Sequence, residues 1–152
     1  MTDDKIVKEH SGNILDYHIP KITPRAVINE VRKKYDYIFT TGGIGHTHDD
    51  VTAVSIAKAF KVKLKKNKEA LNLLKKYYKV KKIPMNDAKE KMALIPHGAE
   101  LLHNPITKAA GFKMKNVYVM AGLPEIMVAM FEKIIRNIKG GNPKITKNIP
   151  IN

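Results

Sequence analysis

The sequence predicts an α/β fold with a largely parallel sheet, because short apolar strands alternate with amphipathic helices along the chain. Two strand-to-helix junctions indicate this most clearly, one at residues 40–52 and one at residues 119–125. The chain has 152 residues, of which 43% are hydrophobic and none is cysteine. This length and composition fit one globular domain that needs no disulfide and no thiolate metal site.

Local signals place the elements of the first third of the chain. Residues 14–19 alternate in polarity like a strand and end before a proline. Thr23 and Pro24 are typical of the N-cap and the first position of a helix. Residues 35–40 have the apolar content of a second short strand.

A glycine turn and a second helix follow this strand. Glycines stand at positions 42, 43 and 45, directly after the strand's carboxyl end. Thr47 and Asp50 resemble a capping box, which predicts Thr47 as the N-cap and Asp50 as the third residue of the helix. The helix is further supported by apolar residues at helical spacing, namely Ala53, Ile56, Ala57 and Phe60.

The second half of the chain continues the alternation. In chain order we expect helices at 67–78 and 86–92, short extended segments at 94–95 and 100–103, a strand at 116–121, and a helix from Pro124 to about Lys139. We assign residues 1–139 to one domain and residues 140–152 to a C-terminal tail rich in Pro, Asn and Ile.

The chain is strongly basic, with a net charge of +14. All but three of its 28 basic residues are Lys, and twelve of these lie in residues 61–91. Lys lacks the planar fork with which Arg recognises bases and phosphates, and only two aromatic residues lie among these lysines. We therefore interpret the charge as a solvated surface that attracts small anions, and nucleic-acid binding is a weaker alternative.

No apolar run approaches the ~18 residues of a membrane span, and the charged start does not resemble a signal peptide. We expect a cytoplasmic protein with no membrane partner.

The first junction carries the residues with the clearest chemistry. Glycine lets the backbone turn sharply and approach a ligand, and the N-terminus of the next helix would attract phosphate, although a plain turn would use glycine in the same way. Asp49 and Asp50 would repel a phosphate unless a divalent cation joined them, which predicts an acid–metal–phosphate arrangement. His48 is a further candidate metal ligand.

The second junction contains Gly122, Pro124 and Glu125. It repeats the order of strand, tight turn and helix N-terminus, so it could lie beside the first junction at the same edge of the sheet. Glu125 alone is an ordinary acid in the first turn of a helix.

Residues 40–52, with the sequence TTGGIGHTHDDVT, are similar to the signature of the molybdopterin-binding (MoaB/Mog-like) domain family, and most of all to its competence/damage-inducible branch. A second block agrees in order and content. It comprises MALIP at 92–96, ELLHNP at 100–105, AGF at 110–112 and NVYVMAGLPEIM at 116–127. The resemblance covers about residues 14–145.

The resemblance implies a three-layer α/β/α sandwich that binds a pterin or a nucleotide phosphate over the glycine loop. In the molybdenum-cofactor branch such domains adenylylate molybdopterin with Mg-ATP. In the competence-related branch they are associated with metal-dependent cleavage of nucleotide pyrophosphates such as ADP-ribose or FAD. The family's loop acid corresponds to Asp50, and Asp49 matches the competence-related branch.

These correspondences give the expected site. Asp50, with Asp49, would be catalytic, and Asp50 with His48 would hold a divalent metal such as Mg²⁺, Mn²⁺ or Co²⁺. The residues expected to bind the ligand, molybdopterin or a nucleotide, are Thr40, Thr41, Gly42, Gly43, Gly45, Thr47, Gly122, Pro124 and Glu125.

The sequence also departs from the family pattern. His46 stands where the family has proline, and the family's first strand with its Gly-Asp/Asn-Glu-Ile-Leu-Ser-Gly motif is missing. We therefore expect a domain shortened at both ends, whose open sheet edge would favour homo-oligomers.

Three functions follow from the sequence. The leading prediction is a domain that binds molybdopterin or a nucleotide phosphate and is related to molybdenum cofactor biosynthesis and to competence-damage-inducible proteins. The alternatives are a metal-dependent nucleotide pyrophosphatase, and an inactive shortened domain that acts only as a binding module.

Overall fold

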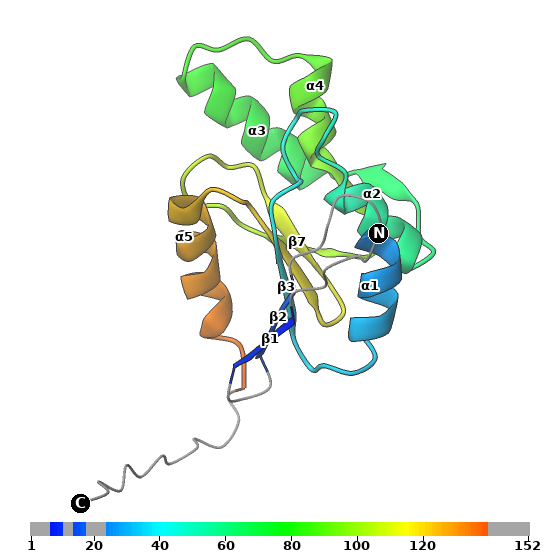
Figure 1. Ribbon diagram of the computed structural model, residues 1–152. Coiled ribbons are helices and arrows are strands. Elements are labelled where there is room, and N and C mark those ends of the chain that lie inside the picture. Colours follow the sequence, from blue (N-terminus) through cyan, green and yellow to red (C-terminus); the bar gives the residue numbers. More distant parts are fainter. Residues whose placement is uncertain (1–6, 11–13, 18–23, 140–152) are drawn as a thin grey trace, which may run out of the picture.

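The computed structural model describes residues 7–10, 14–17 and 24–139, and the side chains from residue 27 onward. Helix α5 (Pro124–Ile135) lies on one side of a central sheet, and helices α1 (Pro24–Val31) and α2 (Thr52–Ala59) lie on the other (Figure 1). The predicted three-layer α/β/α architecture is confirmed. The tail at 140–152 lies outside the described residues.

The central sheet has four strands in the order β3-β8-β7-β6. These are β3 (Ile38–Thr41), β8 (Val117–Met120), β7 (Gly111–Met114) and β6 (Glu100–Leu102). β3 and β8 run parallel, whereas β8 with β7 and β7 with β6 are antiparallel.

The described sheet is therefore mixed and not largely parallel as the sequence predicted. The reason is the connection between β7 and β8, which has only two residues, Lys115 and Asn116. A connection this short joins antiparallel strands only, and Lys115 adopts a φ of 54° to make the turn. The sequence analysis placed a strand over β8 but did not predict β7.

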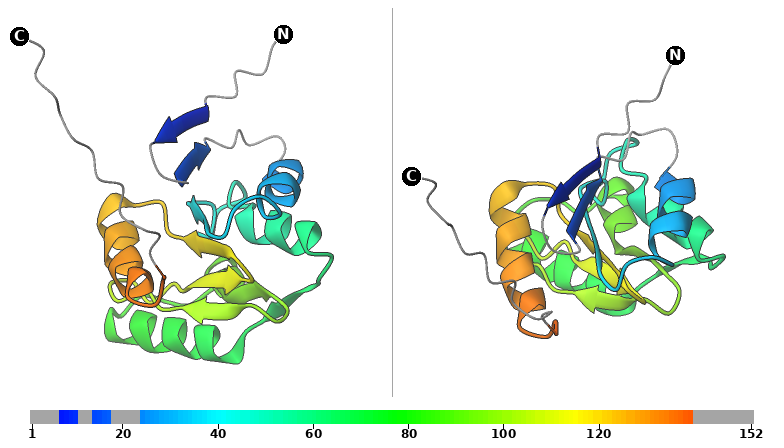
Figure 2. Two further views of the ribbon diagram at one scale, coloured as in Figure 1. Left: turned by 90° about the horizontal axis from the view of Figure 1, so that it is seen from below. Right: turned by 60° about the horizontal axis from the view of Figure 1, so that its bottom comes forward.

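Two smaller sheets accompany the central one (Figure 2). Strands β1 (Val7–His10) and β2 (Ile14–Tyr17) form an antiparallel pair, which confirms the strand predicted from residue 14 as far as Tyr17. Residues 18–19 lie outside the described residues. Strands β4 (Leu64–Lys66) and β5 (Leu94–Pro96) form the other antiparallel pair, and of these only β5 was predicted.

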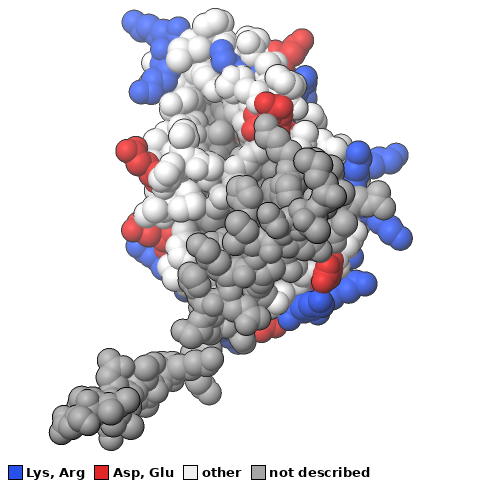
Figure 3. Space-filling view, viewed as in Figure 1, with Lys and Arg blue, Asp and Glu red and all other residues white. Residues whose placement is uncertain are grey.

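The helices at 67–78 and 86–92 are confirmed with small changes. They are α3 (Lys68–Val80), α4 (Asp87–Glu90) and the 3₁₀ turn η1 (Lys91–Ala93). Asn67 and Asn86 cap α3 and α4, because their side-chain oxygens accept hydrogen bonds from the N–H groups three residues later, at 3.0 and 2.9 Å. Figure 3 shows Lys and Arg side chains at the end of the molecule that carries α3.

Two helix ends differ from the prediction. Helix α5 begins at Pro124 as predicted but ends at Ile135, because the next turn closes with i→i−3 bonds from Asn137 and Ile138. Helix α2 begins at Thr52, with Val51 as its N-cap, and not at Thr47. Thr47 and Asp50 still make the predicted hydrogen bond, but they make it in a turn that precedes the helix.

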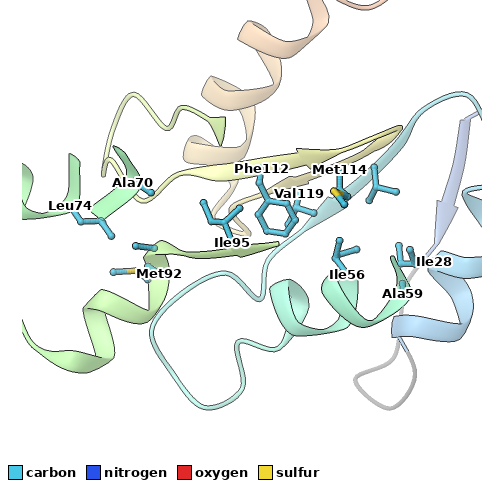
Figure 4. Packing of buried hydrophobic residues seen from close by; sticks show 12 residues of the cluster. Ile28, Ile56, Ala59, Ala70, Leu74, Met92, Ile95, Phe112, Met114 and Val119 are labelled. Atoms are coloured by element: carbon cyan, nitrogen blue, oxygen red, sulfur yellow. The ribbon is translucent and has the colours of Figure 1, made fainter. Parts of the chain in front are cut away.

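The sheet separates two apolar clusters. On the side of α1 and α2, Phe112, Ile56 and Val119 belong to the main core (Figure 4). On the side of α5, Tyr118 and Met130 belong to a smaller cluster. All four residues of β8 are buried because successive side chains enter opposite clusters. This burial fixes β8, and with it the two junctions at the carboxyl ends of β3 and β8.

Within the described ranges, no helix is long and apolar enough to cross a membrane.

Candidate anion-binding site at the glycine loop

The two junctions lie side by side, as the sequence predicted. Because β3 and β8 are parallel neighbours, their carboxyl ends meet at one edge of the sheet. The Gly42 N–H donates a 2.9 Å hydrogen bond to the Met120 carbonyl. A Cβ placed on Gly122 would lie 3.0 Å from the Gly42 Cα. The two turns therefore approach as closely as backbones can, and this contact requires glycine.

The glycine loop, residues 42–50, is held by the first residue of α2. The Thr52 hydroxyl donates to the Gly42 carbonyl at 3.0 Å, and the Thr52 N–H donates to the Gly43 carbonyl at 3.0 Å. Gly43 has a φ of +69°, and a Cβ on it would overlap the Thr52 hydroxyl. The glycine at position 43 is therefore required both by its backbone conformation and by its neighbour.

Asp50 organises the rest of the loop. Its Oδ2 accepts hydrogen bonds from the Thr47 N–H at 2.8 Å and from the Thr47 hydroxyl at 2.7 Å. Partial burial on its own raises the Asp50 pKa, but the hydrogen bonds from Thr47 and Gly45 and the charge of His46 outweigh it, so the pKa is lowered from 3.8. A Cβ on Gly45 would lie 2.7 Å from Oδ2, so glycine leaves room for this carboxylate. Asp50 is therefore ionised at neutral pH.

A hollow of about 110 Å³ opens beside the loop. Gly43, Gly45, Thr47 and Asp50 line it on the loop side. The remaining walls come from α2, η1 and the strands, namely Ile44, Ala53, Val54, Leu64, Lys91, Met92, Leu94, Ile95, Ala110 and Phe112. This volume holds a group the size of a phosphate, whereas pockets for whole small molecules reach about 300–1,000 Å³.

The N-terminus of α2 points backbone donors at this hollow. Val51 is the N-cap and has no side-chain oxygen that could accept from the first turn. In the described part of the chain, the N–H groups of Ala53 and Val54 have no acceptor, and both residues line the hollow. The sequence predicted donors at a helix starting near Thr47, so the correction moves them to Ala53 and Val54.

Lys91 is a lining residue that the sequence analysis missed. Of the residues that line the hollow, only Asp50 and Lys91 carry a formal charge. Lys91 begins η1, and Figure 1 shows the loop after β3 rising toward α4, which η1 follows. Lys91 is one of twelve lysines in residues 61–91, so composition alone could not single it out.

The predicted metal ligands separate in the structure. The residues lining the hollow include Asp50 but neither His48 nor Asp49. The His48 side chain is 93% exposed, and its Nε2 lies 3.5 Å from Asp49 Oδ1. Among the described residues, no group of three His, Asp or Glu side chains could hold a metal ion. Roles for His48 and Asp49 therefore stay predictions.

The other predicted ligand-binding residues lie around the hollow but do not line it. Gly122, Pro124 and Glu125 are exposed in the second junction. Thr41 is exposed, and Thr40 Oγ1 is a buried atom without a hydrogen-bond partner in the described structure. Gly42 contacts Gly122 and accepts from Thr52, so its function in the loop is structural.

Residues 5–140 of the chain match the family model described as a probable molybdopterin binding domain. A protein from Archaeoglobus fulgidus is 39% identical over 114 residues, which cover 75% of this chain and 48% of that protein. A CinA-like protein from a Sulfurihydrogenibium species is 37% identical over 106 residues, which cover 66% of this chain and 26% of that protein. The chain thus spans less than half the length of these curated relatives.

A solved structure agrees with the fold and the branch. The crystal structure of the protein CinA from Thermoplasma acidophilum, described as having unknown function, matches with a TM-score of 0.67 and 26% identity. The match covers 74% of this chain and 68% of that one.

Proposed function

The chain belongs to the probable molybdopterin binding domain family, with CinA-like proteins among its relatives, and on this premise we propose that the hollow at the glycine loop binds the phosphate group of an anionic pterin or nucleotide. The observation that carries the proposal is the uncapped start of α2. Its two N–H groups without acceptors, at Ala53 and Val54, line a hollow of phosphate size.

The charges around the hollow support the proposal. The Lys91 ammonium group, at the wall opposite the loop, would pair with a phosphate oxygen. Because the hollow is small, the pterin or nucleoside would extend beyond it and lie on the open surface of the domain.

Asp50 fits a divalent cation that arrives together with the phosphate. Mg²⁺ is commonly held by one or two carboxylates together with substrate phosphates, and Asp50 offers one ionised carboxylate in the hollow. A bound cation would neutralise the phosphate charge there. Mn²⁺ and Co²⁺ are the other candidates.

The ionised Asp50 also favours a second function, a metal-dependent nucleotide pyrophosphatase. In that function the Ala53 and Val54 N–H groups and Lys91 would stabilise the negative charge that grows on the phosphate under attack by water. A domain that binds without cleaving is the remaining alternative. The connection to molybdenum cofactor biosynthesis is likewise a proposal, which gains support if a pterin binds more tightly than a nucleotide.

Thermal unfolding in the presence of ligands tests the proposal. We expect AMP, ATP or FAD with Mg²⁺ to raise the melting temperature of the wild-type protein, because a ligand that binds only the folded state stabilises it. Lys91→Met should reduce this rise, and Lys68→Met, which removes an exposed lysine outside the hollow, should leave it unchanged. No shift with any nucleotide or with a pterin would contradict the proposal.

Product analysis separates the two functions. If the protein cleaves ADP-ribose or FAD with Mg²⁺, Mn²⁺ or Co²⁺, the pyrophosphatase is supported, and Asp50→Asn should abolish cleavage. Full cleavage by Asp50→Asn would show that the assignment of the metal to Asp50 is wrong.

A further inference from the structure

A second hollow of about 160 Å³ lies next to the first. Lys66, Asp87, Glu90, Lys91 and Leu94 line it. Lys91 and Leu94 also line the hollow at the glycine loop. The two hollows therefore share a wall, and the shared polar group is the Lys91 ammonium.

The polar groups of the second hollow differ in how far they are already satisfied. Lys66 Nζ and Glu90 Oε2 form a 2.7 Å ion pair, and the hydrogen bond and charge of Lys66 lower the pKa of Glu90. In the described part of the chain, the side chains of Asp87 and Lys91 have no hydrogen-bond or ion-pair partner. One free carboxylate and one free ammonium group thus face the same hollow.

This combination indicates what the second hollow would bind. The carboxylates of Asp87 and Glu90 would repel a phosphate, so a second phosphate is disfavoured there. A free carboxylate is the group that proteins use to accept hydrogen bonds from the hydroxyls of a ribose. The Lys91 ammonium, between the two hollows, would stay with the phosphate that links the sugar to the first hollow.

We propose that the two hollows form one binding groove, in which the second hollow binds the hydroxyl-bearing sugar of a sugar–pyrophosphate ligand and Asp87 accepts hydrogen bonds from that sugar. This inference rests on the proposed function, because the phosphate of the same ligand occupies the hollow at the glycine loop. It narrows the ligand from any anion to one that carries a sugar beyond its phosphates.

Calorimetric titration at low ionic strength with Mg²⁺ tests the proposal with two probes, inorganic pyrophosphate and ADP-ribose. Pyrophosphate reaches the first hollow only, and ADP-ribose adds the sugar. We expect Asp87→Asn to weaken ADP-ribose binding about tenfold and to leave pyrophosphate binding unchanged, because the loss of one hydrogen bond to a charged group has about this effect. Lys91→Met should weaken both probes.

Asp36→Asn is the matched control, because Asp36 is an exposed aspartate outside both hollows. It should bind both probes like the wild type, and circular dichroism of Asp87→Asn should confirm that α4 is intact. Normal ADP-ribose binding by Asp87→Asn would overturn the sugar subsite while leaving the proposed function standing. If the wild-type protein binds neither probe, the proposed function itself fails, and the inference fails with it.

Discussion

The two strand-to-helix junctions of this domain lie side by side yet differ in what they offer a ligand. At the first, residues 42–52, the loop folds back on Thr52, and Asp50, Ala53 and Val54 line a hollow. At the second, residues 121–125, the turn is exposed, and its residues do not line that hollow. Leu123, the N-cap of α5, is 66% exposed.

The difference follows from what stands opposite each junction. The first faces η1 and β5, which supply Lys91 and the apolar wall of the hollow. The second has Gly42 on one side, and its closest contact is backbone against backbone. A strand, a glycine turn and a helix N-terminus are therefore common to both junctions, and the element opposite the turn decides which of them can enclose a ligand.

The largest expected effect sharpens this comparison at its glycines. Gly43→Ala should lower the free energy of unfolding by about 3 kcal/mol or more, because the new Cβ overlaps the Thr52 hydroxyl and the φ is positive. Gly98→Ala is the control, since its φ is +85° and no atom lies within 4 Å of the new Cβ. It should cost about 1–2 kcal/mol from backbone strain alone. Equal costs in urea unfolding would show that the contact with Thr52 does not hold the loop.

The acids of the two junctions should differ by a smaller amount. Asp50→Asn should cost about 1–2 kcal/mol of stability, since it weakens the hydrogen bonds that Thr47 donates to the carboxylate. Glu125→Gln should stay within about 0.5 kcal/mol, because Glu125 is an exposed first-turn acid of α5. Similar costs for the two variants, measured by chemical denaturation, would remove the distinction between the junctions.

Thr52 should contribute about as much as one ordinary hydrogen bond. Thr52→Val removes the donor to the Gly42 carbonyl and should lower the unfolding free energy by about 1 kcal/mol. Thr52→Ser keeps the hydroxyl and should retain most of the stability. If the serine variant were as unstable as the valine variant, the methyl group and not the hydroxyl would be the stabilising feature.

The smallest effect concerns pH. The folded pKa of Asp50 is lowered from 3.8, so its contribution to stability is complete above that value and is lost as the pH falls through the folded pKa. Between about pH 5 and pH 3, wild-type stability should therefore fall more steeply than that of Asp50→Asn. Parallel pH profiles in thermal unfolding would contradict the lowered pKa. Glu125→Gln should follow the wild-type profile.

The elements that the sequence predicted correctly depend on local signals. Pro24 and Pro124 start helices as expected, and Asn67 caps α3. The missed strands β4 and β7 are short and contain lysine, and they exist because β5 and β8 pair with them. Pairing between residues distant in sequence is not visible in a local pattern.

The site shows the same division. The glycines, Thr47 and Asp50 could be identified from their spacing, and the structure places Gly43, Gly45, Thr47 and Asp50 in the wall of one hollow. The start of α2 was misplaced because a hydrogen bond between an acid and the N–H three residues earlier occurs in a turn as well as in a capping box. Lys91 and Asp87 were missed because tertiary packing, and not spacing, brings them to the groove.

The most direct test of the central claim is the affinity for inorganic pyrophosphate with Mg²⁺, measured by calorimetry on the wild type, Lys91→Met and Glu125→Gln. If the hollow at the first junction is the phosphate site, the wild type and Glu125→Gln bind equally and Lys91→Met binds about tenfold more weakly, as expected for the loss of one charge-assisted contact. Unchanged binding by Lys91→Met together with weakened binding by Glu125→Gln would place the site at the second junction and contradict the account.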